Sequence, residues 1–300
     1  MRIHMQCKTY FARQFAWLRA LIGLDEKVFA QSLARCKPWK ARGGKSNSRF
    51  ARTLDERFIL KQVQAVELEG FLAFAPIYFD YFSKVYFQQV PTAICKIVGI
   101  FSVSISRKGK TPVKVDLIVQ ENLFYGHNIT KTFDLKGSLR SRYARPESPD
   151  DKDVVLMDEN LLEMMYGEPI CVTNEAKAML AMTVWNDTLC LSSLNVMDYS
   201  LLVGVDETNN RLVLGIIDYM RTYTWDKQIE TYVKRSGILG GTGPSKSKIP
   251  TIISPKQYKK RFRVAIWAYF LLIPNLNTKL IYEFIANTTT TSQKTSIMKA

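Results

Sequence analysis

The sequence predicts an α+β protein of two lobes, in which an antiparallel sheet in each lobe is flanked by helices. Two hairpin patterns lie far apart in the chain, at residues 48–63 and 199–217. Apolar residues at helical spacing follow the first hairpin over residues 65–85 and precede the second from residue 173 onwards. With 300 residues, 47% of them hydrophobic, the chain is long enough to fill two small cores.

The composition favours an anionic partner and argues against a transmembrane or zinc protein. Lys and Arg number 42 against 27 Asp and Glu, which gives a net charge of +15 and fits nucleic acid, nucleotide or an acidic membrane. The five cysteines show no CxxC spacing and have only two histidines as partners, which predicts a reduced, cytosolic compartment. The longest apolar stretch, residues 264–273, is too short to cross a bilayer, so any membrane contact is expected to be peripheral.

The first lobe is predicted to span residues 1–145. Residues 1–24 carry four basic residues and no acidic one, which fits a transit peptide or a basic strand and helix; the helical spacing of apolar residues favours the second interpretation. The hairpin at 48–63 turns at Asp55-Glu56. The helix over 65–85 is expected to kink or divide at Pro76. Two apolar stretches, at 93–105 and 113–120, are predicted to be strands of the same sheet.

The second lobe is predicted to span residues 146–274, and residues 275–300 are expected to form a disordered tail. A polar insert over 146–153 precedes a helix for which Thr173 is the expected N-cap. The second hairpin is followed by a long loop over 219–255 that is rich in glycine and proline. A final helix over 255–273 begins with a basic cluster and continues with apolar residues.

Two aspartates lie at the open end of the second hairpin. If the hairpin is symmetric about Thr208, Asp198 and Asp218 face each other with Cβ atoms roughly 4.5–5.5 Å apart. Carboxylates this close repel unless a cation or a shared proton relieves them, and Mg²⁺ held by one or two carboxylates and substrate phosphates is common at phosphoryl-transfer sites. The alternative is that the aspartates simply terminate the two strands.

A glycine-led hairpin in the first lobe could hold phosphates. Gly43-Gly44-Lys45-Ser46 precedes the hairpin and would let backbone N–H groups approach an anion. A P-loop is excluded because its first glycine would stand at Trp39 and because a hairpin follows instead of a helix. Lys61, on the second strand, is placed to hold ATP phosphates and to pair with Glu67 or Glu69; the alternative is a surface lysine on an edge strand.

At these residues the sequence resembles the phosphatidylinositol phosphate kinase family. The match runs over about residues 36–274, and its most specific segments are Phe133-Asp134-Leu135-Lys136-Gly137-Ser138, Met197-Asp198-Tyr199-Ser200-Leu201-Leu202-Val203-Gly204 and Gly215-Ile216-Ile217-Asp218. Segments such as Gly43-Gly44-Lys45-Ser46 and Tyr223-Thr224-Trp225-Asp226-Lys227 resemble the type III, PIKfyve-like branch. The resemblance implies the two-lobed fold of this family.

The resemblance also implies roles for individual residues. Asp198 corresponds to the catalytic aspartate and Asp218 to the metal-binding aspartate, with ATP and Mg²⁺, or Mn²⁺, as cofactors. Lys61 is implied to hold the ATP phosphates, and Lys136 to reach the ATP or substrate phosphates. The nucleotide would further contact Gly43, Gly44, Lys45, Ser46, Glu121 and Asn122, the last two in a stretch over 119–123 that would line the adenine pocket.

For activity, the resemblance implies a 1-phosphatidylinositol-3-phosphate 5-kinase, an ATP-dependent phosphotransferase acting on the inositol 5-hydroxyl of phosphatidylinositol 3-phosphate. The loop from Tyr219 onward corresponds to the activation loop, which governs lipid choice. Residues 219–263 carry eleven basic and two acidic residues, enough to hold an anionic membrane surface. The residues expected at lipid or membrane are Lys234, Arg235, Lys256, Lys259 and Lys260. The implied location is cytosolic, at the periphery of endosomal or vacuolar membranes.

Two alternative functions remain at this point. A catalytically weak phosphoinositide-binding scaffold would fit the same charge, although all three core positions, Lys61, Asp198 and Asp218, are present. A nucleic-acid-binding protein would explain the charge but not the paired aspartates. The chain is expected to be an isolated kinase domain or a fragment, with regulatory or scaffold proteins supplying other domains.

Overall fold

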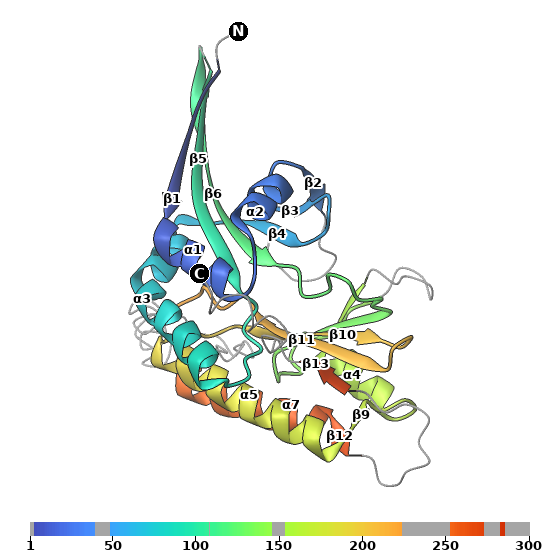
Figure 1. Ribbon diagram of the computed structural model, residues 1–300. Coiled ribbons are helices and arrows are strands. Elements are labelled where there is room, and N and C mark those ends of the chain that lie inside the picture. The colour runs from blue at the N-terminus through green and yellow to red at the C-terminus, as the bar shows by residue number, and fades with distance from the viewer. Residues whose placement is uncertain are drawn as a thin grey trace, which may run out of the picture.

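A computed structural model describes residues 3–39, 49–107, 109–145, 154–223, 253–272 and 283–285. These residues form two large sheets, each accompanied by helices, and the α+β prediction is confirmed. In Figure 1 one large sheet lies above the other, with long helices along one side. The glycine run 43–46, the insert 146–153 and most of the loop 219–255 lie outside the described residues.

The six-stranded sheet is antiparallel throughout and has the order β1-β5-β6-β4-β3-β2. The predicted hairpin and both predicted return strands belong to it. Strands β1, β5 and β6 extend together well beyond the remaining strands as a narrow arm (Figure 1). The strands are β1 (Ile3–Tyr10), β2 (Cys36–Trp39), β3 (Phe50–Thr53), β4 (Phe58–Val63), β5 (Ile97–Arg107) and β6 (Lys110–Glu121).

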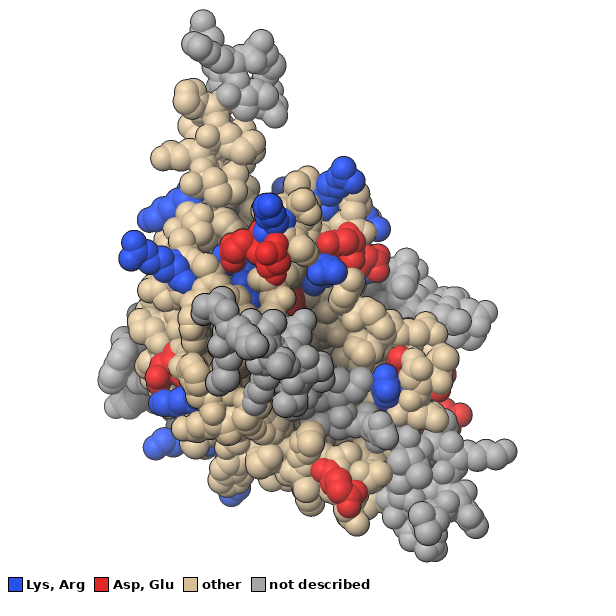
Figure 2. All heavy atoms as spheres, in the orientation of Figure 1, with Lys and Arg blue, Asp and Glu red and all other residues tan. Residues whose placement is uncertain are grey.

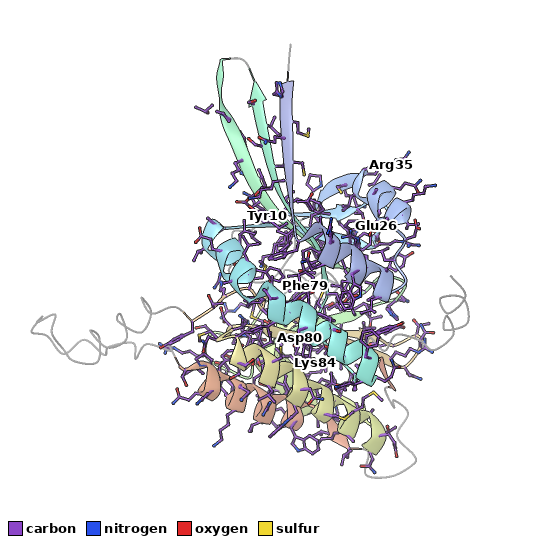
Figure 3. All side chains as sticks on the ribbon, turned by 60° about the vertical axis from the view of Figure 1, so that its left-hand side comes forward. Tyr10, Glu26, Arg35, Phe79, Asp80 and Lys84 are labelled. Carbon is purple, nitrogen blue, oxygen red and sulfur yellow. The ribbon has the colours of Figure 1, made fainter. Side chains whose placement is uncertain are left out.

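Three helices accompany this sheet: α1 (Ala12–Leu21), α2 (Glu26–Leu33) and α3 (Ala65–Gln88). Helix α3 is longer than predicted and continues through Pro76 without being divided. Its Phe79 packs edge to face against Phe15 of α1 with ring centroids 5.0 Å apart, and Phe15 is 1% exposed. On its outer face Asp80 and Lys84 form an ion pair of 2.8 Å; Figure 3 labels all three α3 residues.

The second sheet is mixed and has the order β13-β11-β10-β7-β8, so it includes β7, which lies within the range predicted for the first lobe. Its central strands are antiparallel, as expected, and the outer pairs β7–β8 and β11–β13 are parallel. Strand β13 falls within the predicted tail, whose other residues are not described. The strands are β7 (Lys131–Leu135), β8 (Val155–Met157), β10 (Ser200–Asp206), β11 (Arg211–Ile217) and β13 (Glu283–Ile285), with a separate pair formed by β9 (Cys171–Val172) and β12 (Leu271–Leu272).

The helices of the second lobe are α4 (Asp158–Met165), α5 (Asn174–Ser193) and α7 (Pro255–Tyr269). The predicted N-cap is confirmed, because the Thr173 side chain accepts a hydrogen bond of 3.1 Å from the Ala176 N–H. Helices α5 and α7 lie side by side (Figure 1). No helix in the described ranges has the length and apolar character needed to span a bilayer.

The register of the second hairpin differs by one residue from the symmetric prediction. Ser200 pairs with Ile217 and Asp206 with Arg211, so the hairpin is centred between residues 208 and 209 instead of on Thr208. The two aspartates are therefore not cross-strand partners. Asp198 precedes β10 and Asp218 follows β11, and both have left-handed backbones, with φ of 66° and 60°.

The two lobes share one continuous apolar core. The segment after α3 reaches the second sheet, where the Ile216 N–H donates to the Ala93 carbonyl at 2.6 Å and the Cys95 N–H donates to the Ile216 carbonyl at 3.0 Å. The segment after β6 lies against the same strand, because Leu123 fills the space where a side chain at Gly215 would stand. These contacts bring the end of β4 close to the open end of the β10–β11 hairpin.

Candidate active site

Lys61 and Asp218 form an ion pair that joins the two sheets. Lys61 lies on β4 of the first sheet and is 5% exposed, and its Nζ lies 2.7 Å from Oδ1 of Asp218, just beyond β11 of the second sheet. Burial raises the pKa of Asp218, but the nearby charge and hydrogen bond of Lys61, with smaller contributions from Lys136 and Arg221, outweigh burial and hold the pKa below its usual value. Asp218 is therefore ionised at neutral pH.

Lys136 and Asp198 form a second pair beside the first. Lys136 directly follows β7, and its Nζ donates to the backbone carbonyl of Asp198 at 2.7 Å and to Oδ1 of the same residue at 2.8 Å. Because Lys136 also lowers the pKa of Asp218, one ammonium group acts on both aspartates. The structure thus brings together all four predicted residues of the catalytic centre, Lys61, Lys136, Asp198 and Asp218.

A third cation, Arg221, completes the cluster and was not predicted from the sequence. Its Nη1 lies 3.2 Å from Oδ2 of Asp198, and its Nε lies 3.6 Å from Oε1 of Glu67 on α3. The expected pairing of Lys61 with Glu67 or Glu69 is therefore corrected: Lys61 pairs with Asp218, while Glu67 pairs with Arg221 and caps α3. The only signal in the sequence was the position of Arg221, three residues after Asp218.

A buried carboxylate outside the predicted motifs holds Lys136 in place. Asp158, at the start of α4, is fully buried and accepts hydrogen bonds from the Lys136 N–H at 3.1 Å and the Gly137 N–H at 2.8 Å. It also accepts from Tyr269 Oη at 3.0 Å and from Arg142 Nε at 2.8 Å. Four donors on one buried carboxylate fix the backbone from which Lys136 reaches Asp198.

Helix α7 packs against the same segments. The Tyr258 hydroxyl donates to the Tyr199 carbonyl, and the Tyr199 and Phe262 rings meet edge to face with centroids 5.0 Å apart. The predicted lipid or membrane residues on α7 are Lys256 and Lys260, which are exposed, and Lys259, which is half-buried. Lys234 and Arg235, and the phosphate-binding candidates Gly43, Gly44, Lys45 and Ser46, lie outside the described residues.

The predicted adenine segment joins the two lobes at the end of β6. Glu121 forms an ion pair of 3.2 Å with Lys96, and its N–H donates to the Lys96 carbonyl at 3.0 Å. The Asn122 side chain donates to the Glu56 carbonyl in the β3–β4 turn at 2.7 Å. The side chains of both residues thus make structural contacts, and their role toward a nucleotide stays a prediction.

The two aspartates suit a divalent cation bound together with phosphates. Their side chains are 42% and 44% exposed, so both carboxylates are accessible from solvent. Carboxylate oxygens are the ligands that Mg²⁺ prefers. Within the described ranges no cluster of three or more His, Cys, Asp or Glu side chains could hold a metal by itself, so an ion here would complete its coordination with phosphate oxygens and water.

Charged side chains elsewhere on the first lobe balance one another. Figure 2 shows acidic and basic side chains intermingled over α2 and β2–β4 instead of a patch of one sign. Pairs in this region include Arg19 with Glu26 at 2.6 Å and Arg52 with Glu56 at 2.8 Å. Where the two sheets meet, the ion-paired residues Lys61, Lys136, Arg221, Asp198 and Asp218 lie together, and they are named here the catalytic cluster for the role that the sequence predicts.

A family model and several curated proteins match this chain, and all of them are phosphatidylinositol phosphate kinases by name. The sequence model of the phosphatidylinositol-4-phosphate 5-kinase family matches residues 37–212, more than half of the chain. The Arabidopsis thaliana protein named 1-phosphatidylinositol-3-phosphate 5-kinase FAB1A is 52% identical over 277 residues, which cover 91% of this chain and 15% of that protein.

Relatives from other kingdoms bear similar names. The 1-phosphatidylinositol 3-phosphate 5-kinases of Homo sapiens and Saccharomyces cerevisiae are 47% and 45% identical, each over 273 residues and 90% of this chain. The match covers 13% of the human and 12% of the yeast protein. This chain therefore spans only a small part of the length of the curated relatives it matches.

Proposed function

Because the chain belongs to the phosphatidylinositol-4-phosphate 5-kinase family, we propose that it is an ATP-dependent lipid kinase that phosphorylates the inositol 5-hydroxyl of phosphatidylinositol 3-phosphate. The product would be phosphatidylinositol 3,5-bisphosphate. One observation carries the proposal: two aspartates at the open end of one hairpin are each paired with a lysine, at 2.7 and 2.8 Å, and one of these lysines comes from the other lobe.

The choice of acceptor lipid rests on the relatives. Three relatives, at 45–52% identity, are named as 5-kinases acting on the 3-phosphate, and they cover about nine-tenths of this chain. This supports phosphatidylinositol 3-phosphate as the substrate and the type III branch as the place of this chain in its family. Family membership implies ATP as the phosphoryl donor. We propose that Mg²⁺ binds together with ATP as the metal cofactor and that Mn²⁺ can replace it.

In the proposed reaction Asp198 accepts the proton of the inositol hydroxyl as this oxygen attacks the γ-phosphorus of ATP, and the bond from the γ-phosphorus to the β,γ-bridging oxygen breaks so that ADP leaves. Lys61 and Lys136 balance negative charge on the phosphates, and their ammonium groups already lie beside the two carboxylates. Asp218, ionised at neutral pH, is the residue that would hold the metal, with Asp198 as its neighbour. When bound, Mg²⁺ supplies positive charge that neutralises the transferred phosphoryl group.

We also propose that the protein acts from the cytosolic side at the periphery of endosomal or vacuolar membranes. Exposed Lys256 and Lys260 at the start of α7 support contact with an anionic surface, because each basic residue near such a surface contributes about 1 kcal/mol. Lys234 and Arg235 would add to this contact. Regulatory or scaffold proteins are proposed as further partners, since the relatives are several times longer than this chain.

The test is a kinase assay with radiolabelled ATP and Mg²⁺ on vesicles of phosphatidylcholine and phosphatidylinositol 3-phosphate, followed by head-group chromatography of the product. The wild type is expected to give the 3,5-bisphosphate. Asp198→Asn is expected to lower turnover by about 10²–10⁴-fold, the usual contribution of a general base, while vesicle binding persists. Asp80→Asn, on the outer face of α3, is the matched control and should retain full turnover. Vesicle binding by the wild type without any labelled lipid would instead support the scaffold alternative.

A further inference from the structure

Arg221 occupies a position that is fixed by its own backbone. The Met197 N–H donates to the Arg221 carbonyl at 3.1 Å, and the Tyr223 N–H donates to the Asn195 carbonyl at 2.8 Å. Between these bonds Val196 and Thr222 form an antiparallel bridge. The residues that lead into Asp198 and the residues around Arg221 are therefore paired like two short strands. This pairing fixes the backbone of Arg221 relative to that of Asp198.

Helix α3 fixes the same segment from the other side. A Cβ at Gly70 would lie 3.3 Å from both the Met220 carbonyl and Thr222 Oγ1, so the helix and the segment are in close contact. One turn earlier, Glu67 is 8% exposed and directs Oε1 toward Arg221 Nε at 3.6 Å, while its Oε2 accepts the Gln64 N–H at 3.1 Å. Glu67, which is buried and caps α3, thus orients the Arg221 guanidinium in the absence of a ligand.

Of the three cations in the catalytic cluster, Arg221 is the one open to an incoming molecule. Its side chain is 51% exposed, against 6% for Lys61 and 20% for Lys136. Its Nη1 faces Asp198 Oδ2 at 3.2 Å, on the carboxylate oxygen that Lys136 leaves free. A planar guanidinium can donate two parallel hydrogen bonds to a phosphate, which an ammonium group cannot do.

We propose that Arg221 binds the phosphate that the acceptor inositol ring already carries, and that it thereby selects a phosphorylated ring over an unphosphorylated one. This inference rests on the proposed lipid kinase function. The hydroxyl to be phosphorylated must lie at Asp198, so a phosphate on the same ring comes within one ring diameter of that carboxylate. Arg221 is a half-exposed cation already in contact with that carboxylate. Its guanidinium would exchange Asp198 for the ring phosphate, leaving Oδ2 free for the hydroxyl.

The test compares Arg221→Gln and Arg221→Lys with the wild type and with Arg13→Gln, an exposed arginine on α1 that serves as the matched control. Initial rates are measured on vesicles that contain either phosphatidylinositol 3-phosphate or phosphatidylinositol, at varied lipid and varied ATP. For Arg221→Gln we expect KM for the 3-phosphate to rise about 10–100-fold, the loss of one charge-assisted bidentate contact. KM for ATP should stay within about twofold of wild type, and the preference for the 3-phosphate over phosphatidylinositol, measured as the ratio of the two kcat/KM values, should fall by about the same 10–100-fold. Arg221→Lys should have a KM for the 3-phosphate between those of the wild type and Arg221→Gln, because lysine keeps the positive charge but lacks the two parallel donors of the guanidinium.

A second measurement does not depend on turnover. Calorimetry with soluble inositol 1,3-bisphosphate and inositol 1-phosphate gives the dissociation constant of each head group for the wild type and the Arg221 variants. We expect the bisphosphate to bind the wild type more tightly, and Arg221→Gln to remove that difference. If the wild type made no lipid product, the proposed function would fail, but this comparison would still decide whether Arg221 recognises the ring phosphate.

Three outcomes would overturn the inference. An equal loss of kcat on both lipids would show that Arg221 only positions Asp198. A raised KM for ATP with unchanged KM for the lipid would assign the guanidinium to the nucleotide. Equal affinity of Arg221→Gln and wild type for the bisphosphate head group would show that no ring phosphate is bound there.

Discussion

Replacing Gly137 by alanine should damage both the packing of α7 and the placement of Lys136. Gly137 has φ of +65°, and a left-handed backbone costs alanine about 1–2 kcal/mol. The new Cβ would lie 2.8 Å from the Cβ of Ala265, 3.2 Å from Cα of Phe262 and 3.3 Å from the Arg261 carbonyl, so α7 would have to shift. Overpacking of this kind costs about 1–3 kcal/mol, which gives a total loss of about 2–5 kcal/mol.

Gly109 provides the matched control because it has φ of +78° and nothing within 4 Å of an added Cβ. Gly109→Ala should therefore lose only the strain of about 1–2 kcal/mol. Thermal unfolding followed by tryptophan fluorescence should place Gly137→Ala roughly 2–12 °C below Gly109→Ala, at 2–4 °C per kcal/mol. Turnover should fall by about 10²-fold only in Gly137→Ala, because a displacement near 1 Å of a catalytic group has that effect. Equal midpoints for the two variants would refute the steric part of the reasoning.

Three further predictions concern single side chains. Lys61→Met should raise the pKa of Asp218. The stability that the ion pair gives the wild type is present above about pH 4 and is lost as Asp218 is protonated. The unfolding midpoint of Lys61→Met should therefore lie further below that of the wild type at pH 7 than at pH 3.5. Burial raises the pKa of Asp187 to about 6, so the contribution of this group to stability should be largest below about pH 4 and be lost as the pH rises through 6. The difference in unfolding midpoint between the wild type and Asp187→Asn should therefore change over this range in thermal scans. Thr173→Ala should lower the free energy of unfolding in urea by about 1 kcal/mol through loss of the α5 cap, and an unchanged midpoint would contradict the assigned hydrogen bond.

Much of the fold could be predicted because its signals are local. Alternating apolar residues and turn residues identified both hairpins, and Thr173 identified the start of α5. The register of the second hairpin was not accessible in the same way, because one residue more or less in a polar turn moves every pair without changing the pattern. Pro76 was expected to kink or divide α3; the helix is not divided, and the aromatic residues around Pro76 are buried.

The catalytic cluster was only partly predictable for a related reason. Lys61, Lys136, Asp198 and Asp218 lie in recognisable motifs, whereas Asp158 and Arg221 depend on contacts between segments that are distant in the sequence. An aspartate that opens a helix usually has a capping role, so nothing marked Asp158 as the support of Lys136. Likewise, Lys61 was expected to pair with Glu67 or Glu69 because kinases have such a pair, although the folded chain places Glu67 beside Arg221.

The catalytic cluster also bears on the state of this protein before it meets a substrate. With Glu67 included, three carboxylates and three cations neutralise one another within hydrogen-bond or ion-pair distance at the junction of the lobes. In the folded structure each charge of this group therefore has a counterion from the chain itself, without a bound nucleotide. When ATP binds, its phosphates would replace carboxylates of the chain as partners of the lysines. We therefore expect the nucleotide to rearrange ion pairs that have already formed.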